Sequence, residues 1–314
     1  MNILIIGFGN MGCRHLQSLI TEFPEINAYV IEPNLENFQK NCEKIGYDSG
    51  KIKLISLKAA KTTKFDLVII ATLASKRIDI LKEILSLSWK KLLIEKVVFN
   101  RLNDFTEYRK LFQNLNKHTY INFVNRYFPS NISIKEKYSK STKLTLSVFG
   151  GDVNYGSNAI HYIDLFEYIT NSKAVYESGR ITETSTQNKR GNMFSNYHGE
   201  CIFKNNNDDY LHFNLNESLG KNNAHMMFNL HDCSITVNEK EKLVFETSQI
   251  KNSNNLSQYK VLPTSELTAI IYKDIIADNC LLPHIYSSKN AHQELFKSIQ
   301  NSKKLNPNKS FLIT

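Results

Sequence analysis

Three glycines near the start of the chain, Gly7-x-Gly9-x-x-Gly12, have a spacing that could hold a phosphate. They follow the apolar run NILIIG and open the stretch NMGCRHLQSLI, whose apolar residues have helical spacing. Glycines at such a turn let the backbone approach a pyrophosphate, and the helix N-terminus attracts the anion. The alternative is a structural turn without a ligand, because three glycines at this spacing also arise by chance.

An acidic residue further along favours a dinucleotide. Glu32 ends the next predicted strand, AYVIE, twenty residues beyond Gly12. A carboxylate there accepts hydrogen bonds from both hydroxyls of the adenosine ribose and repels a 2′-phosphate. We therefore expect NAD rather than NADP. The expected contacts in this region are Gly7, Gly9, Asn10, Met11, Gly12 and Glu32.

A second candidate group ends a later strand, KKLLIEKVVF. Glu95 and Lys96 should lie at the carboxyl edge of a parallel sheet, where open α/β sheets bind ligands. A lysine desolvated beside a nicotinamide could donate or accept the proton of a substrate hydroxyl, and Glu95 could orient it. The alternative is an ordinary surface Glu-Lys pair.

A third group lies on the predicted helix SNAIHYIDLFEYI, where Ser157, His161 and Asp164 occupy nearby faces. His161 could exchange a proton with a sugar hydroxyl. A half-buried histidine bonded to Asp164 is the alternative. We expect no metal, because no third ligand has suitable spacing. Other histidines lie singly in predicted strands or on surfaces and are interpreted as structural, namely His15, His198, His225 and His231.

The elements that must position these groups follow two patterns. Up to about residue 122, short apolar strands such as FDLVIIATL and KKLLIEKVVF alternate with helices such as KRIDILKEILSLS. A further helix is expected to begin after Asn103 or Asp104, before the strand YINFV. This alternation predicts a doubly wound parallel sheet covered on both faces.

Beyond residue 122, strands such as TKLTLSVFGG and AHMMFNLHDCSITVNE follow one another through Asn, Asp and Gly turns. They predict a large, mostly antiparallel open sheet with one early helix and two C-terminal helices. The polar stretch NSNNLSQ, 252–258, is expected to be a loop. The fold class is thus α/β, with a dinucleotide-binding domain over 1–122 and a substrate-binding and oligomerisation domain over 123–314.

Composition narrows the functional classes. The 314 residues are 41% hydrophobic and carry a net charge of +9, with scattered lysines rather than a basic stripe. A phosphate-bearing small molecule explains this charge better than a nucleic acid, for which no recognised module is present. Five widely spaced cysteines indicate reduced thiols in a cytoplasm. The apolar run at the start is too short for a signal peptide or a membrane span, so no membrane partner is expected.

Four separated pieces together resemble the glucose-fructose oxidoreductase, inositol dehydrogenase and MocA (Gfo/Idh/MocA) family: GFGNMGCRHLQSL, IEKVV, NRYFPS and GGDVNYGSNAIHYIDL. The resemblance implies pyridine-dinucleotide redox chemistry on sugars, cyclitols or nucleotide sugars, and a homodimer or homotetramer formed through the second sheet. It also implies catalytic roles for Lys96 and His161. Further cofactor contacts would come from Ala71, Thr72 and Glu95, and substrate contacts from Lys96, Asn125, Arg126, Asn158 and His161.

Three positions depart from the family pattern. Val97 follows the lysine where the family has proline, which removes a rigid backbone constraint, and Ser157 stands where an aspartate is frequent. Arg77 lies near a frequent histidine position, where it could contact the cofactor or a substrate phosphate, or lie on a solvated helix face.

The leading hypothesis is therefore an NAD-dependent dehydrogenase or reductase of a sugar derivative, such as a nucleotide sugar or acidic sugar used in surface-polysaccharide assembly. A dinucleotide-binding regulator or scaffold without catalysis is the second hypothesis, because motif matches need their full context. The third is a nucleic-acid-binding protein, which predicts strongly salt-dependent binding to DNA or RNA.

Overall fold

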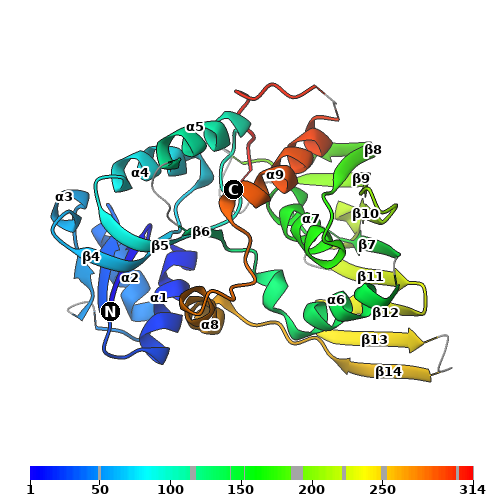
Figure 1. Cartoon of the computed structure of the whole chain (residues 1–314), viewed down its shortest axis with the longest axis horizontal. Helices are drawn as coiled ribbons and strands as arrows, with labels where there is room; N and C mark the ends of the chain where they lie inside the picture. The colour runs from blue at the N-terminus through cyan, green and yellow to red at the C-terminus, as the bar shows by residue number, and fades with distance from the viewer. Residues whose placement is uncertain are drawn as a thin grey trace. The chain divides into compact units, whose positions relative to one another are not determined.

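The chain forms two compact units in the computed structural model (Figure 1), which describes residues 1–48, 51–113, 118–141, 143–151, 153–184, 194–220, 224–248, 253–301 and 304–313. The first unit consists of Met1–Val124 and Leu262–Ser287. The second consists of Asn125–Val261 and Ser288–Thr314. The chain thus returns to its first unit after most of the second has formed.

The first unit is built on a six-stranded sheet in the order β3-β2-β1-β4-β5-β6, and every pairing is parallel. The strands are β1 Asn2–Ile6, β2 Asn27–Ile31, β3 Lys53–Leu54, β4 Lys64–Ile70, β5 Ser88–Ile94 and β6 His118–Ile121. Chain order reverses between β1 and β4, and in open α/β sheets ligands bind outside the carboxyl ends of the strands at this reversal. The expected doubly wound sheet is confirmed.

Helices connect these strands: α1 Asn10–Glu22, α2 Leu35–Lys44, α3 Leu57–Ala60, α4 Arg77–Ile84 and α5 Leu102–Phe112. The start of α5 differs from the expectation of a helix beginning after Asn103 or Asp104. Asp104 lies buried inside the first turn, and its carboxylate pairs with Arg101 at 3.0 Å instead of capping the helix. The helix thus begins at Leu102, before both residues after which it was expected to begin.

Helix α8, Thr264–Ile276, belongs to the first unit although it follows the second sheet in the sequence. It packs against α1, where the backbone N–H of Ala269 donates to Ser18 Oγ at 3.0 Å. Phe23 and Tyr272 meet edge to face beside this contact, with ring centroids 5.8 Å apart. The division of the sequence at residue 122 did not anticipate this return.

The second unit contains an eight-stranded sheet in the order β14-β13-β12-β11-β7-β10-β9-β8. Among the described residues of this sheet, only β7 and β10 pair in parallel, so the expected mostly antiparallel sheet is confirmed. The strands are β7 Leu144–Gly150, β8 Val175–Glu183, β9 Tyr197–Lys204, β10 Tyr210–Leu215, β11 Ala224–Leu230, β12 Cys233–Asn238, β13 Leu243–Ser248 and β14 Ser253–Gln258.

Helix α7, Tyr155–Thr170, packs on one face of this sheet against β7, β9 and β10. Alternate residues of β7 and β11 are buried beneath the helical layer, and those between them are half-buried on the other face. The remaining helices of this part are α6 Pro129–Ser141 and α9 Ile285–Gln300, and the sequence analysis did not predict α6.

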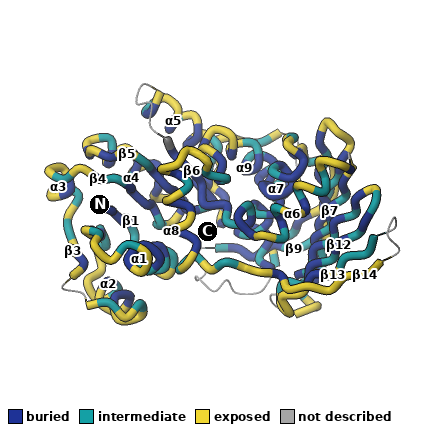
Figure 2. Tube along the Cα trace, turned by 60° about the horizontal axis from the view of Figure 1, so that its bottom comes forward, coloured by how far each residue is buried: buried dark blue, intermediate teal, exposed yellow. Residues whose placement is uncertain are grey.

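Strand β14 corrects the expectation of a loop at 252–258. It pairs antiparallel with β13 along its whole length, although all six of its residues are exposed (yellow in Figure 2). A strand at the edge of a sheet is held by backbone hydrogen bonds and needs no buried side chains. Its sequence therefore carries no apolar alternation from which a strand could be predicted.

Candidate functional site

The glycine turn between β1 and α1 uses its three glycines differently. Gly7 has φ +87°, a left-handed conformation that favours glycine, and a Cβ at Gly12 would lie 2.0 Å from the carbonyl oxygen of Gly7. The fold itself therefore requires glycine at positions 7 and 12. Gly9 has φ −76°, and no described atom lies within 4 Å of where its Cβ would be. Gly9 therefore leaves open space at the N-terminus of α1.

Glu32 places a carboxylate directly beside this turn. One oxygen, Oε2, accepts the backbone N–H of Phe8 at 2.9 Å, and Oε1 accepts that of Asn34 at 3.1 Å. Both donors are neutral amides, and each carboxylate oxygen keeps lone pairs for further donors. Both oxygens can therefore accept further hydrogen bonds.

A lysine ammonium group from α2 lies at the first turn of α1, and the sequence analysis did not predict it. Asn10 is exposed and Met11 half-buried, and the Asn10 side-chain oxygen accepts a hydrogen bond from Lys44 Nζ at 2.6 Å. Lys44 is the last residue of α2, so only the packing of α2 brings its ammonium group to the N-terminus of α1. A positive charge and open backbone N–H groups at a helix N-terminus can hold an anion.

Ala71 and Thr72 follow β4 and lie against the glycine turn. A Cβ on Gly7 would be 2.7 Å from the Thr72 methyl group and 3.1 Å from the Ala71 carbonyl carbon. Thr72 Oγ1 is buried and has no hydrogen-bond partner in the part of the chain that the structure describes. The segments that follow β1 and β4 thus lie side by side at the sheet reversal.

Glu95 and Lys96 follow β5. Glu95 is 5% exposed, and its Oε1 accepts hydrogen bonds from His15 Nε2 at 2.9 Å and Asn122 Nδ2 at 2.6 Å. Burial by itself raises the pKa of Glu95, but the bond and charge of His15, the charge of Lys96 and the Asn122 bond outweigh it and lower the pKa to about 2. Lys96 is half-buried, and its peptide bond to Val97 is cis.

His15 corrects the interpretation of this histidine as an isolated residue in a strand or on the surface. It lies on the buried face of α1, is 0% exposed, and contacts Glu95 on one side and Thr268 of α8 on the other, with Nδ1 2.8 Å from the hydroxyl. The one available signal was a polar residue among the apolar positions of α1, next to Leu16. That signal does not reveal the partners.

Arg77 does not lie on a solvated helix face, which was one of the two places expected for it. It is 4% exposed, and its Nε and Nη2 donate to the Thr72 carbonyl at 3.0 and 2.6 Å. Nη1 donates to the carbonyls of Glu95 and Val97. The planar, five-donor guanidinium group suits such a bridge between the segments after β4 and β5. Arg77 thereby connects the segment that carries Lys96 to the sheet reversal.

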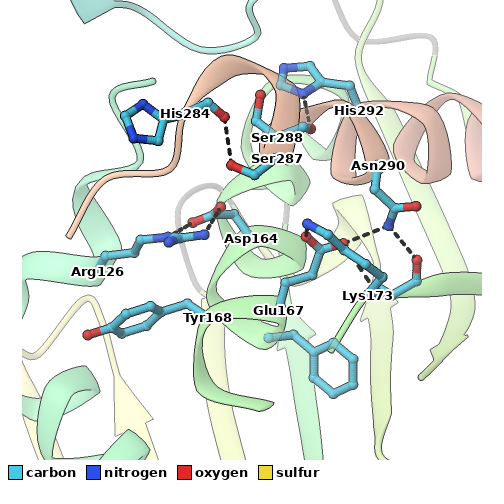
Figure 3. A network of polar contacts seen from close by, with 12 residues as sticks. Arg126, Asp164, Glu167, Tyr168, Lys173, His284, Ser287, Ser288, Asn290 and His292 are labelled. Atoms are coloured by element: carbon cyan, nitrogen blue, oxygen red, sulfur yellow. Dashed lines mark hydrogen bonds and ion pairs between the residues drawn. The ribbon is translucent and has the colours of Figure 1, made fainter. Parts of the chain in front are cut away.

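In the second unit, Arg126 and Asp164 form a buried ion pair at the centre of Figure 3. Nε and Nη2 of Arg126 each donate to a different oxygen of Asp164, at 2.8 and 2.7 Å. Burial raises the pKa of Asp164, and the charge and hydrogen bonds of Arg126 oppose it. Both oxygens of this carboxylate are therefore engaged by arginine, whereas the sequence analysis weighed a bond with His161.

His161 is half-buried on α7, about one helical turn beyond Asn158. The Asn158 amide donates to the Val153 carbonyl at 2.6 Å, which holds the segment that leads into α7. Asn125 is 8% exposed, and its carbonyl oxygen accepts the Asn131 amide at 2.9 Å. These contacts hold the backbone around Asn125 and Asn158, two of the four residues expected to bind substrate in this unit.

The other end of α7 is anchored by a second carboxylate. Glu167 accepts hydrogen bonds from Lys173 at 2.8 Å and from Asn290 at 2.7 Å (Figure 3). The Asn290 amide also donates to the Ala174 carbonyl at 2.8 Å. Ties at both ends give α7 a fixed position on its sheet, which a helix carrying catalytic groups requires.

The candidate residues thus fall into two sets. The expected cofactor contacts and Lys96 belong to the first unit, whereas Asn125, Arg126, Asn158 and His161 belong to the second.

Among the helices that the structure describes, none is long and apolar enough to cross a membrane.

Comparison with known proteins agrees with the sequence motifs. Residues 1–123 match the family model described as an oxidoreductase family with an NAD-binding Rossmann fold, which confirms the Gfo/Idh/MocA resemblance. No curated protein sequence matches the chain.

Solved structures match almost the whole chain at low sequence identity. UDP-N-acetylglucosamine 3-dehydrogenase GnnA from Acidithiobacillus ferrooxidans is 13% identical, with a TM-score of 0.72 over 96% of this chain and 97% of its own. An oxidoreductase from Agrobacterium radiobacter, solved with NAD+, L-tartaric acid and magnesium, is 10% identical, with a TM-score of 0.75 over 98% of each chain. The transcriptional regulator Gal80p from Kluyveromyces lactis is 15% identical, with a TM-score of 0.68 over 98% of this chain and 91% of its own. At these identities the likeness establishes the fold alone.

Proposed function

Because the chain belongs, through residues 1–123, to the Gfo/Idh/MocA oxidoreductase family, we propose that it is an NAD-dependent oxidoreductase acting on a sugar derivative. The observation that carries this proposal is Gly9. Its backbone conformation suits any residue and its Cβ would meet open space, so the fold gains nothing from glycine there. A ligand that approaches the backbone at the N-terminus of α1 does need that space.

The backbone N–H groups of Gly9, Asn10 and Met11, together with the Lys44 ammonium group, would hold the pyrophosphate of the cofactor. Glu32 accepts hydrogen bonds from the ribose hydroxyls, because its carboxylate is held against the turn by the Phe8 amide. The same negative charge disfavours a 2′-phosphate, so NAD is preferred over NADP. Ala71 and Thr72 line the reversal of the sheet on the far side of Gly7.

The proposed chemistry divides between the nicotinamide and two side chains. When bound, NAD would supply hydride chemistry through its nicotinamide ring. Lys96 takes the proton of the substrate hydroxyl as the carbon that bears this hydroxyl gives up its hydride, and returns the proton in the reverse direction. His161 is the second proton relay. Asn125, Arg126 and Asn158 bind the substrate. Glu95 acts on Lys96 as a buried negative charge, which is supported by its low pKa.

A nucleotide sugar or acidic sugar is the proposed substrate class, within surface-polysaccharide assembly in the cytoplasm. The net charge of +9 favours an anionic ligand. The GnnA structure, which has this fold, is named as a dehydrogenase of such a compound, UDP-N-acetylglucosamine.

We also propose a homodimer or homotetramer formed through the open face of the second sheet. On that face Phe149 stacks on His225 with ring centroids 5.5 Å apart, and Phe245 of β13 is 45% exposed. Aromatic side chains grouped on an uncovered sheet face favour burial against a second copy.

The first experiment is a calorimetric titration of the purified protein with NADH and with NADPH, after mass spectrometry for any dinucleotide carried through purification. We expect NADH to bind more tightly than NADPH. In Gly9→Ala the added methyl group should weaken NADH binding at least tenfold, while circular dichroism and the melting temperature stay unchanged because the methyl meets no protein atom. If neither dinucleotide binds or is carried over, the oxidoreductase proposal fails.

Turnover is tested separately with Lys96→Met. This change should abolish hydride transfer to nucleotide sugars and leave the affinity for NADH within a few fold. Retained turnover would remove Lys96 from the mechanism. Tight NADH binding by the unaltered protein, with no turnover on any sugar, would instead favour the regulator or scaffold hypothesis.

A further inference from the structure

A short segment that follows α9 packs against the start of α7, the helix on which the proposed function places two substrate-binding side chains. Phe311 and Ile313 are 3% and 2% exposed, whereas Leu312 between them is 51% exposed. This alternation is typical of an extended segment with one buried face. We call Phe311–Ile313 the anchoring segment. It belongs to the second unit, as α7 does.

An aromatic stack and a backbone hydrogen bond hold the anchoring segment in place. The Phe311 ring stacks on Phe296 of α9, with ring centroids 4.1 Å apart and 13° between the ring planes. The Leu312 carbonyl accepts the backbone N–H of Ser195 at 2.9 Å. These contacts fix the direction of the segment, and Ile313 thereby reaches α7.

The anchoring segment meets α7 at the backbone of its first turn. A Cβ on Gly156 would lie 2.7 Å from the Cγ2 methyl group of Ile313 and 2.8 Å from Cδ2 of the Tyr197 ring. Both distances are shorter than an ordinary carbon–carbon contact of about 3.5 Å or more. Gly156 is helical, a conformation that suits any residue, so glycine is needed there for this close approach.

The turn that Ile313 contacts leads directly to the proposed substrate-binding residues. The backbone N–H groups of Ser157 and Asn158 donate to the Asn154 carbonyl at 3.1 and 3.0 Å and form part of this turn. His161 follows about one helical turn later. A shift of the first turn would therefore displace Asn158 and, through the same helix, His161.

Other contacts of α7 do not involve the anchoring segment. Asp164 pairs with Arg126, and Glu167 accepts hydrogen bonds near the other end of the helix (Figure 3). At the first turn, Tyr155 is 0% exposed and its hydroxyl lies 2.7 Å from Ser298 Oγ of α9. Loss of the contact with the anchoring segment should therefore loosen this turn without detaching the helix.

We propose that Ile313 is a positioning residue for the substrate-binding end of α7, acting through the backbone of Gly156 on Asn158 and His161. The proposal rests on the proposed function for the roles of these two side chains. Groups that bind or react with a substrate must be held within about 0.5 Å of their productive positions. A displacement of roughly 1 Å can cost about a hundredfold in rate.

The first test needs no substrate and uses the full-length protein. Hydrogen–deuterium exchange, read by mass spectrometry with fragmentation to single amides, compares Ile313→Ala with the unaltered protein. We expect residues 156–161 to exchange at least about tenfold faster in the variant, because the methyl group that contacts the turn is missing. Exchange over residues 165–170, at the other end of α7, should be unchanged.

Two variants are matched controls. Leu312→Ala shortens the neighbouring side chain, which is 51% exposed, and should leave the exchange at 156–161 unchanged. Ile313→Val keeps a side chain branched at Cβ, including the methyl group that contacts Gly156, and should retain the protection of the unaltered protein.

Turnover gives a second measurement, with UDP-N-acetylglucosamine as the first sugar probe. In Ile313→Ala, kcat/KM for the sugar should fall at least about tenfold, and Ile313→Val should restore it. The Kd for NADH should stay within about twofold, because the expected cofactor contacts belong to the first unit. A role confined to stability would leave the kcat/KM of the folded variant unchanged.

Unchanged exchange at 156–161 in a folded Ile313→Ala variant would overturn the proposal, and so would an equal rise across the whole second unit. If the variant does not fold, the unaltered protein decides, because the Ser195 amide reports opening of the anchoring segment. After correction for intrinsic rates, Ser157 and Asn158 should exchange no faster than Ser195. Faster exchange would mean that the turn opens while the segment stays in place, and the proposal would fail.

The two proposals fail in different ways. Absence of turnover by the unaltered protein on any nucleotide sugar would refute the proposed function. The exchange measurements would still decide whether Ile313 holds the first turn of α7.

Discussion

Replacing Glu95 with glutamine should remove most of one acid-sensitive contribution to the stability of the first unit. The folded-state pKa of Glu95, about 2, lies below the usual 4.5. A carboxylate whose pKa is lowered by folding stabilises the protein above its unfolded pKa, and this contribution is lost as the pH falls through the folded pKa. The affected range is therefore about pH 4.5 down to about pH 2.

The size of the effect follows from the two pKa values. The difference between 4.5 and about 2, at about 1.4 kcal/mol per unit, corresponds to about 3 kcal/mol at neutral pH. Roughly 2 kcal/mol of this should already be lost between pH 7 and pH 3. Glu95 is 5% exposed, so solvent screens the interaction little.

The protein contains a single tryptophan, which makes the assay specific for this unit. Trp89 lies on β5, the strand that leads to Glu95, and is 4% exposed. Urea unfolding followed by its fluorescence, repeated at steps from pH 7 to pH 3, gives the free energy of unfolding of the surrounding unit. The matched control is Glu83→Gln, the same change at an exposed position of α4.

The expected result is a difference between the unaltered protein and Glu95→Gln that shrinks by about 2 kcal/mol as the pH falls from 7 to 3. The curve for Glu83→Gln should stay parallel to that of the unaltered protein. If the curve for Glu95→Gln is parallel as well, Glu95 is not a buried carboxylate whose pKa is lowered by folding.

Three further substitutions test the rest of the site. Glu32→Ala should weaken NADH binding about thirtyfold, through the loss of two hydrogen bonds worth about 1 kcal/mol each, and should improve NADPH binding; calorimetric titration with both dinucleotides measures this, and an unchanged preference would contradict the role of Glu32. Arg77→Met should lower the free energy of unfolding by at least about 2 kcal/mol in the tryptophan assay, because several buried carbonyls lose their donor, whereas a near-neutral result would mean that other groups hold the lysine segment. Gly12→Ala should cost more than about 2 kcal/mol in the same assay, since its Cβ would lie 2.0 Å from the Gly7 carbonyl oxygen, and it contrasts with the unchanged stability expected for Gly9→Ala.

Much of the fold could be predicted from the sequence because its strands and helices follow from local patterns of apolar and polar residues. Apolar strands alternating with amphipathic helices indicated the parallel sheet, and alternating strands joined by polar turns indicated the second sheet. The glycine spacing and Glu32 are also local, since both lie within one strand-turn-helix-strand unit. That unit brings its turn and its second strand end together whatever the rest of the chain does.

The interactions around Lys96 depended on the tertiary structure. His15 and Glu95 are separated by 80 positions, and Thr268 is separated from His15 by 253. No periodicity in the sequence relates these residues. The sequence pattern of a helix also does not distinguish a buried histidine with polar partners from other buried positions. These contacts exist because α8 returns to pack on α1 and because the fold brings His15 of α1 to the segment after β5.

Arg77 and β14 show the same limit in two other ways. From the sequence, Arg77 was expected to lie on a solvated helix face or to contact a ligand. In the structure it donates to backbone carbonyls, which every residue has and which no sequence pattern identifies as acceptors. β14 is likewise held by backbone pairing to β13. The sequence by itself determined which apolar segments would form strands and helices. It also determined where the glycine turn would lie. Only the folded structure decided which polar groups would meet, because hydrogen bonding to the backbone and between distant side chains depends on three-dimensional proximity and leaves no periodic trace in the sequence.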